Sequence, residues 1–250
     1  MPNYVLLNPA QHQGLKITAS NDFAFCQQHH HCPLVVHEFG SAASSFPVIY
    51  LKDSQQGQFR AVGLLSLITG HNSFYCDQQW TAVHVPYAYT RIPFELGPDP
   101  EQDKTLTVYL DLDSEAVNEN HGEALYENGQ ATQFLQKVEQ KMLEYYQQEQ
   151  LSHRFTQQLL TLNLLQEMEL LLEFADGKIS RLKGLYTINE QALRQLSDEQ
   201  ILALNQQNFL LPIHAMLTSL VQVNRLIKQH NSRSDNTISG VKMRVIAEEN

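Results

Sequence analysis

The hydrophobic pattern of the chain changes near residue 125, and this change limits the folds that the chain can form. Before that point, short runs of β-branched and aromatic residues are separated by Pro, Gly, Asn and Asp, which is typical of strands joined by turns. After it, apolar residues recur every three or four positions, which is typical of helices with one buried face. A doubly wound sheet needs strands and helices to alternate. The order therefore predicts an α+β fold, in which an N-terminal, mostly antiparallel β half packs against a C-terminal helical half.

The strands expected in the first half are short, and two of them form a hairpin. We expect strands at residues 4–7, 14–18, 34–39, 48–52, 59–66 and 106–112. The polar residues 53–57 join the fourth of these strands to the fifth, as a hairpin loop does. No helix is predicted before residue 125.

Apolar stripes predict the helices of the second half. The first stripe contains Phe134, Val138, Met142 and Tyr145, and the second contains Phe155, Leu159, Leu162, Leu165 and Met168. Ser152 is suited to cap the second helix. Residues 184–188 are expected to be extended, and Ser197 with Gln200 forms a capping box at the start of a further helix.

The last expected helix, at residues 213–228, has the most continuous apolar stripe. Pro212 is suited to its first turn, and the stripe contains Ile213, Met216, Leu217, Leu220, Val223 and Ile227. We expect Ser219 and Asn224 to face away from the stripe or to cap locally. The stripe covers the β half in one interpretation and forms a homodimer or partner groove in the other, because exposed stripes of this size are rare on monomers.

No repeat and no low-complexity linker divides the chain. We therefore expect one integrated domain, made of a β-rich half at residues 1–125 and a helical half at residues 126–230. The polar residues 231–250 are expected to form a flexible tail.

The charge of the chain argues against nucleic acid as a partner. Lys and Arg total 17 against 27 Asp and Glu, for a net charge of −10, so no global basic field attracts phosphates. The start of the chain lacks the charged and apolar regions of a secretory signal, and no apolar run is long enough for stable membrane insertion. Three cysteines are too few for a disulfide framework. These features predict a cytoplasmic protein.

Three groups of residues invite a metal or catalytic interpretation, and none completes a known pattern. Cys26, His29, His30, His31, Cys32 and His37 lie close together, but their spacing forms no second zinc knuckle. His121 and Glu123 have the spacing of an iron-binding His-x-Glu pair, with His153 or His214 as a conceivable third ligand. Asp111 and Asp113 share one face of a strand end, as a weak cation site or an aspartyl nucleophile pair would. We therefore predict no metal, no cofactor and no catalytic residue.

The segment from Trp80 to Leu96 is the most unusual part of the sequence. It contains the only Trp, three further aromatic residues, two prolines and one Arg within seventeen positions. Aromatic side chains and an Arg that stacks on them would form a binding platform for a peptide or an aromatic ligand. The ligand-binding residues expected on this basis are Trp80, Tyr87, Tyr89, Arg91 and Phe94. A loop folded over the core, with Arg91 neutralising Glu95, explains the same residues.

At this segment the chain resembles the bacterial SapC family. The resemblance rests on residues 46–50 (FPVIY), on Asn72 and Phe74 leading to Trp80, and on residues 84–94 (HVPYAYTRIPF). Later matches are residues 122–126, 128–129 and 184–190, and then 193–219. Thr90 and Ile92 depart from the family pattern, which often has Arg and Tyr there, so an anion-binding role of the element is less favoured.

The resemblance implies a role alongside the products of neighbouring genes, and it implies no particular reaction. Members of the family are often encoded beside outer-membrane receptors, halogenase-like and cupin-like proteins, so we expect a non-catalytic accessory protein in a nutrient-uptake or modification cluster. Its partner would be a small molecule, a peptide or another protein. A metal-dependent oxygenase or hydrolase built on His121, Glu123 and Asp111 is one alternative. A surface-layer component is the other.

Overall fold

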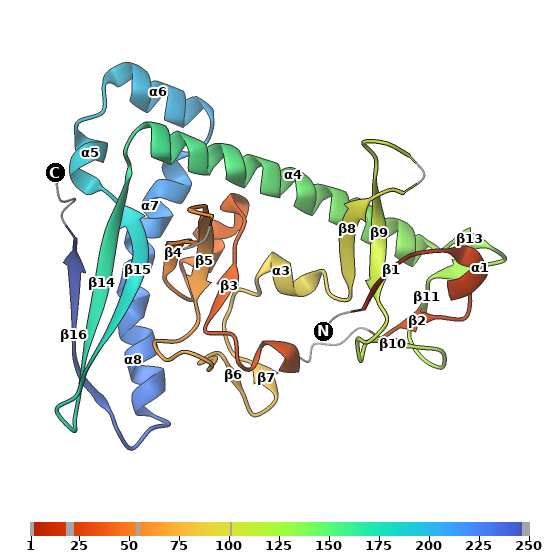
Figure 1. The fold of residues 1–250 in the computed structure, drawn as a ribbon, viewed down its shortest axis with the longest axis horizontal. Helices are drawn as coiled ribbons and strands as arrows, with labels where there is room; N and C mark the ends of the chain where they lie inside the picture. The colour runs from red at the N-terminus through yellow and green to blue at the C-terminus, as the bar shows by residue number, and fades with distance from the viewer. Residues whose placement is uncertain (1–2, 19–22, 54–55, 101, 247–250) are drawn as a thin grey trace. The chain divides into compact units, whose positions relative to one another are not determined.

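The chain forms two compact units that interleave along the sequence. The computed structural model describes residues 3–18, 23–53, 56–100 and 102–246 (Figure 1). The smaller unit contains Met1–Asp22 and Tyr87–Gln150, and the larger contains Phe23–Pro86 and Leu151–Asn250. Strands from the first half of the sequence pair with strands from the second within the larger unit.

The smaller unit is built from short antiparallel strands and one long helix. β1 and β8 flank β9 in one sheet, β10 and β11 flank β2 in another, and β12 pairs with β13. Its elements are β1 (Tyr4–Leu6), α1 (Pro9–His12), β2 (Lys16–Ile17), α3 (Tyr87–Thr90), β8 (Phe94–Pro98), β9 (Leu106–Asp111), β10 (Val117–Asn118), β11 (Glu123–Ala124), β12 (Tyr126–Glu127), β13 (Gln130–Ala131) and the first part of α4 (Gln133–Thr161).

One hydrophobic cluster forms the core of the smaller unit. β9 places Val108 and Leu110 on the same face, two residues apart, and α4 places Leu135 and Met142 on one helix face, seven residues apart. The buried members of the cluster are Ile17, Phe94, Val108, Leu110, Leu125, Tyr126, Leu135 and Met142. The apolar stripe expected at the start of the helical half therefore closes this core.

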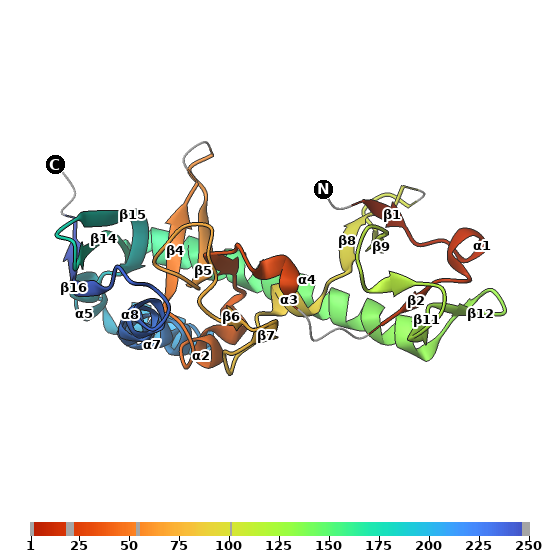
Figure 2. The ribbon, with the colours of Figure 1, turned by 90° about the horizontal axis from the view of Figure 1, so that it is seen from below.

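A six-stranded antiparallel sheet organises the larger unit, with α7 and α8 along one of its faces (Figures 1 and 2). In order across the sheet, the strands are β16 (Ile238–Val245), β14 (Leu165–Phe174), β15 (Ile179–Ile188), β4 (Val48–Lys52), β5 (Phe59–Leu64) and β3 (His31–Pro33). The other elements of this unit are the strands β6 (Tyr75–Cys76) and β7 (Gln79–Trp80), the helices α2 (Phe39–Ala42), α5 (Glu190–Arg194), α6 (Asp198–Gln206), α7 (Leu210–Ser219) and α8 (Val223–Asn231), and the 3₁₀ turns η1 (Ala24–Cys26), η2 (Val36–Glu38) and η3 (Leu220–Gln222).

The fold is α+β, as the sequence predicts, and several of its elements are confirmed. The β4–β5 hairpin has the expected register, with Val48 opposite Gly63. Ser197 and Gln200 make the reciprocal hydrogen bonds of a capping box at the start of α6. In the last apolar stripe, Ile213, Met216 and Val223 are buried in the core of the larger unit. The other three members of the stripe, Leu217, Leu220 and Ile227, are half-buried.

The second half contains more strand than the sequence predicts. The helix expected to continue to Met168 ends at Thr161, and Asn163 then turns the chain with a left-handed backbone (φ 52°) into β14. Leu170, Leu171 and Leu172 are buried on both faces of the sheet, and such a continuous apolar run is typical of a central strand. The tail was also expected to be flexible from residue 231, but Ile238–Val245 pairs with β14 as the edge strand β16.

The segment 34–39 and the side chain of Ser152 differ from their predictions. Residues 34–39 form no strand, because the Glu38 carboxylate accepts a hydrogen bond from the Val35 amide and closes the turn η2 instead. Ser152 caps no helix, since α4 is continuous there. Its hydroxyl instead accepts a hydrogen bond from the Val36 amide at 2.7 Å. Both side chains satisfy backbone donors of the same buried loop.

The stretch Leu210–Asn231 is, within the described residues, the one helical segment long and apolar enough by length and composition to cross a membrane. The most apolar part of it is 39% buried inside the fold. A core helix of a soluble protein meets the same criteria.

Ser219 differs from the expectation that it faces away from the stripe. It is fully buried, and its hydroxyl accepts a hydrogen bond from the Val48 amide at 2.8 Å and donates to the Met216 carbonyl at 2.6 Å. Asn224 is exposed and donates to the Val221 carbonyl, as expected. Ser219 thus links α7 to the sheet through the Val48 amide.

We predict that Ser219→Ala lowers the free energy of unfolding by about 1–3 kcal/mol, because the buried Val48 amide loses its acceptor. Urea unfolding followed by circular dichroism measures the change. Thr218→Ala is the matched control, since the exposed Thr218 hydroxyl bonds only to carbonyls of its own helix. Equal effects of the two substitutions would show that the bond to β4 contributes nothing.

Candidate functional site

The segment that the sequence singles out is divided between the two units. Residues up to Pro86, including Trp80, belong to the larger unit, and residues from Tyr87 onward belong to the smaller. The five expected ligand-binding residues therefore do not form one platform within either unit. Tyr87, Tyr89, Arg91 and Phe94 lie together in the smaller unit.

Trp80 lies on an aromatic cluster of the larger unit. Its ring is 5.9 Å from that of Phe23 and 6.1 Å from that of Phe74, between ring centroids, and the side chain is half-buried. The indole Nε1 donates a hydrogen bond to the His84 carbonyl at 3.0 Å. This bond closes the loop after β7 and leaves Val83, at its tip, 84% exposed.

A buried contact between Glu38 and His84 anchors the same loop. The His84 Nε2 atom lies 2.8 Å from one carboxylate oxygen of Glu38, and the Glu38 side chain is 1% exposed. The His84 amide also donates to the buried Ser45 hydroxyl at 3.1 Å. With both Glu38 oxygens engaged, the carboxylate is compensated inside the protein, and its role is to position the loop.

The aromatic residues of the smaller unit are mostly core residues. Tyr89 and Phe94 are each 5% exposed, and the Phe94 ring packs against Phe134. Tyr87, at the start of α3, is 39% exposed, and Ile92 is 38% exposed. The surface that this part of the segment offers therefore consists of Tyr87 and Ile92 on either side of Arg91.

Arg91 is held by other side chains of the smaller unit. Its guanidinium forms an ion pair with Glu95 and lies 5.2 Å from the centre of the Tyr145 ring. Burial by itself lowers the pKa of Arg91, but the hydrogen bond and charge of Glu95, with Tyr145 and Glu149, outweigh it, so the pKa is raised. Burial raises the pKa of Glu149, which the Arg91 charge partly offsets. The pairing of Arg91 with Glu95 is the arrangement that the sequence left open as the structural alternative.

The candidate metal residues do not gather. In residues 3–18, 23–53, 56–100 and 102–246, no group of three or more His, Cys, Asp and Glu side chains is placed to hold a metal ion. Cys26 and Cys32 are fully buried, and burial raises the pKa of the Cys32 thiol well above its usual range. His121 and Glu123 are exposed near β11, and one oxygen of Asp111 accepts hydrogen bonds from the amides of Asn3 and Asp113.

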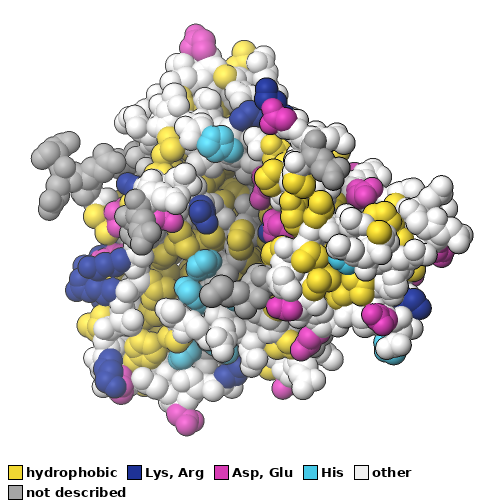
Figure 3. Space-filling view, turned by 45° about the vertical axis from the view of Figure 1, so that its right-hand side comes forward, with side chains coloured by type: hydrophobic (Ala, Val, Ile, Leu, Met, Phe, Trp, Pro, Cys, Tyr) yellow, Lys and Arg dark blue, Asp and Glu magenta, His cyan; other side chains and the backbone are white. Residues whose placement is uncertain are grey.

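The surface carries charges of both signs. Figure 3 shows one face, on which Lys and Arg side chains stand in small groups among Asp and Glu, with hydrophobic side chains between them. The net charge of the whole chain is −10.

Comparison with known proteins identifies a family and nothing finer. A family model described as SapC matches residues 7–226, which include parts of both units. No curated protein and no solved structure was found that matches the chain.

We predict that Glu38→Ala lowers the free energy of unfolding by about 3–5 kcal/mol, because the Val35 amide and the His84 ring both lose a buried partner. Glu38→Gln keeps an acceptor for the Val35 amide and should lower the free energy of unfolding by a smaller amount. Thermal and urea unfolding of both variants measure the difference. Glu190→Ala removes a carboxylate from an exposed pair with Arg194 and should leave stability unchanged. The role assigned to Glu38 is wrong if Glu38→Ala is as stable as Glu190→Ala.

Proposed function

We propose that this chain, which belongs to the SapC family, is a non-catalytic accessory protein that binds a peptide, an aromatic metabolite or a partner protein through the segment Trp80–Phe94. It would serve a nutrient-uptake or modification gene cluster in the bacterial cytoplasm. Within the segment, Arg91 and the exposed Tyr87 would make the main contacts in the smaller unit. The buried Tyr89 and Phe94 would hold these two residues in position.

The observation that carries this proposal is that apolar side chains are exposed on a backbone that is fixed. Tyr87 and Ile92 are both more than a third exposed, while the neighbouring Tyr89 and Phe94 are anchored in the core of the smaller unit. Arg91 between them is already ordered by Glu95 and Tyr145. A surface that needs little ordering on binding loses less entropy, which supports a binding role.

The charge state of Arg91 supports the same role. Its pKa is raised, so the guanidinium is charged at every physiological pH, and its side chain remains 24% exposed. A ligand carboxylate or a backbone carbonyl could therefore reach the exposed edge of the guanidinium while Glu95 holds the other. Such charge-assisted hydrogen bonds are among the stronger contacts in interfaces.

We predict that a molecule or partner co-purifies with the untagged protein and that Arg91→Ala weakens its binding by about 1–3 kcal/mol, the scale of a lost charge-assisted contact. Native mass spectrometry identifies the bound species, and titration of that species into the ligand-free protein measures the affinity. Tyr87→Ala should also weaken binding while leaving stability within about 0.5 kcal/mol of wild type.

The control is Leu143→Ala, which removes an exposed apolar side chain from α4 in the same unit. Unchanged binding by Arg91→Ala, with reduced stability, would assign Arg91 to the core alone. Stoichiometric iron or zinc in the untagged protein would instead favour the metal-dependent enzyme. The distribution of the native protein in fractionated cells tests the cytoplasmic location against the surface layer.

A further inference from the structure

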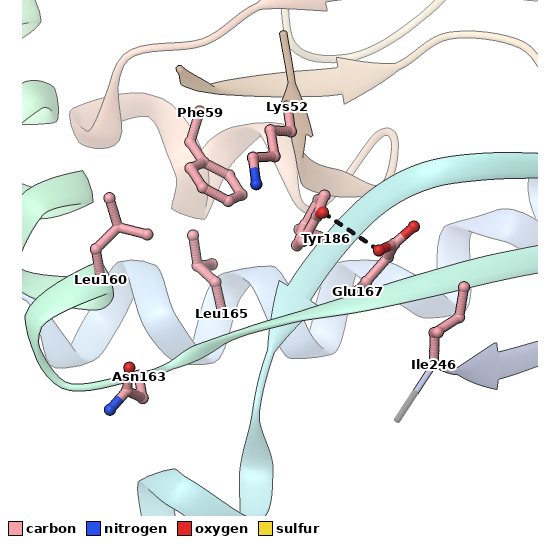
Figure 4. A pocket seen from close by; sticks show the side chains of 8 residues that line it. All are labelled: Lys52, Phe59, Leu160, Asn163, Leu165, Glu167, Tyr186 and Ile246. Atoms are coloured by element: carbon pink, nitrogen blue, oxygen red, sulfur yellow. Dashed lines mark hydrogen bonds between the residues drawn. The ribbon is translucent and has the colours of Figure 1, made fainter. Parts of the chain in front are cut away.

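The larger unit contains a cavity that lies outside the segment Trp80–Phe94. It has a volume of about 220 Å³. Eight residues line it: Lys52, Phe59, Leu160, Asn163, Leu165, Glu167, Tyr186 and Ile246 (Figure 4). They come from four strands of the six-stranded sheet, from the last turn of α4 and from the ends of the adjoining segments.

The strand register explains why these side chains meet. Lys52 lies opposite Phe59 on the β4–β5 hairpin, and Glu167 lies opposite Tyr186 on the β14–β15 hairpin. Tyr186 also lies opposite Tyr50, two residues before Lys52, so all four side chains project from one face of the sheet. From standard strand spacings, the Cα atoms of Lys52 and Glu167 are about 12 Å apart.

The two charged groups of the cavity are not paired with each other. Within the described part of the chain, no carboxylate forms an ion pair with Lys52, whose ammonium lies 5.4 Å from the centre of the Phe59 ring. Glu167 accepts a hydrogen bond from the Tyr186 hydroxyl that is long, at 3.3 Å. Figure 4 shows Lys52, Phe59 and Tyr186 directed into the same space, with Glu167 beyond the Tyr186 hydroxyl. One cation and one anion thus face a common space while both keep capacity for further hydrogen bonds.

The remaining walls are formed by three apolar side chains and by Asn163. Leu160, Leu165 and Ile246 line the cavity, and the Phe59 and Tyr186 rings pack edge to face with 4.9 Å between centroids. An engineered cavity of about 150 Å³ is enough for benzene, so the present one accommodates a ring with a short polar head. It is too small for a chain of several residues.

We infer that this cavity binds a free α-amino acid with an apolar side chain. Lys52 would contact the carboxylate, Glu167 the ammonium, and the Phe59–Tyr186 wall the side chain. The formal charges of the lining cancel, so a zwitterion is bound without leaving an uncompensated charge, whereas an anion or a cation alone would leave one. This site is separate from the segment Trp80–Phe94, and either can fail without the other.

Isothermal titration calorimetry with L-phenylalanine and L-leucine tests the inference on the 250-residue chain. Both should bind. N-acetyl-L-phenylalanine lacks the ammonium and L-phenylalaninamide lacks the carboxylate, so each should bind about tenfold more weakly or not at all, since each leaves one charged group of the cavity unmatched. L-glutamate should not bind, because its side chain would place a charge against the apolar wall.

Two substitutions separate the contacts. Lys52→Met should weaken the binding of L-phenylalanine about tenfold and leave the binding of L-phenylalaninamide, which has no carboxylate, unchanged. Glu167→Gln should weaken the binding of L-phenylalanine and leave the binding of N-acetyl-L-phenylalanine, which has no ammonium, unchanged. Lys178→Met, at a site 81% exposed on the β14–β15 turn, is the matched control and should not change affinity. Circular dichroism confirms that each variant is folded.

Amide chemical shifts of the isotope-labelled wild-type protein provide a test that needs no variant. L-phenylalanine should shift the amides around Lys52, Phe59 and Tyr186. No shifts at millimolar ligand, or shifts confined to other residues, would overturn the inference. Equal binding of L-phenylalanine and its N-acetyl form would overturn it in favour of a peptide C-terminus, and equal binding of the amide would overturn it in favour of a peptide N-terminus.

Discussion

The pairing of β15 with β4 is the contact on which the larger unit depends. It joins the hairpin β4–β5, from the first half of the sequence, to the hairpin β14–β15, from the second, through the register pairs Leu185–Leu51 and Tyr186–Tyr50. A short pairing between segments far apart in sequence gains few hydrogen bonds for a large loss of chain entropy. Packing therefore has to support it. Helix α7 contacts both strands, and Ser219 gives the Val48 amide its acceptor.

The sequence predicts the local parts of the fold and not the contacts between distant segments, such as this pairing. The β4–β5 hairpin, the capping box of α6 and the apolar stripe of α7 are local features, and each follows from residues within about one element. The contact of Glu38 with His84 spans 46 residues and that of Ser152 with Val36 spans 116. No periodicity marks either of them. The sequence therefore predicts a local role, such as a cap, for a polar residue that in the structure accepts from a distant backbone amide.

The aromatic segment shows a related limit for the candidate site. Aromatic side chains serve a core and a binding surface equally well, and the density of such residues around Arg91 predicts neither in particular. In the structure Tyr89 and Phe94 are buried, Tyr87 is partly exposed and Arg91 pairs with Glu95. Burial divides one sequence motif into supporting and accessible residues. The sequence does not indicate the cavity, because its residues are spread from Lys52 to Ile246 and no single motif contains them.

The cavity lies beside the C-terminal end of α4. The C-terminal part of α4 covers the sheet face that carries Tyr50, where the Tyr50 hydroxyl and Thr156 lie 2.9 Å apart. The helix ends at Thr161, and the left-handed Asn163 directs the chain into β14, so Leu160 is the last helical side chain at the cavity. The turn at Asn163 therefore has two consequences: it leads the chain into the interior strand β14, and it ends the helical wall of the cavity at Leu160.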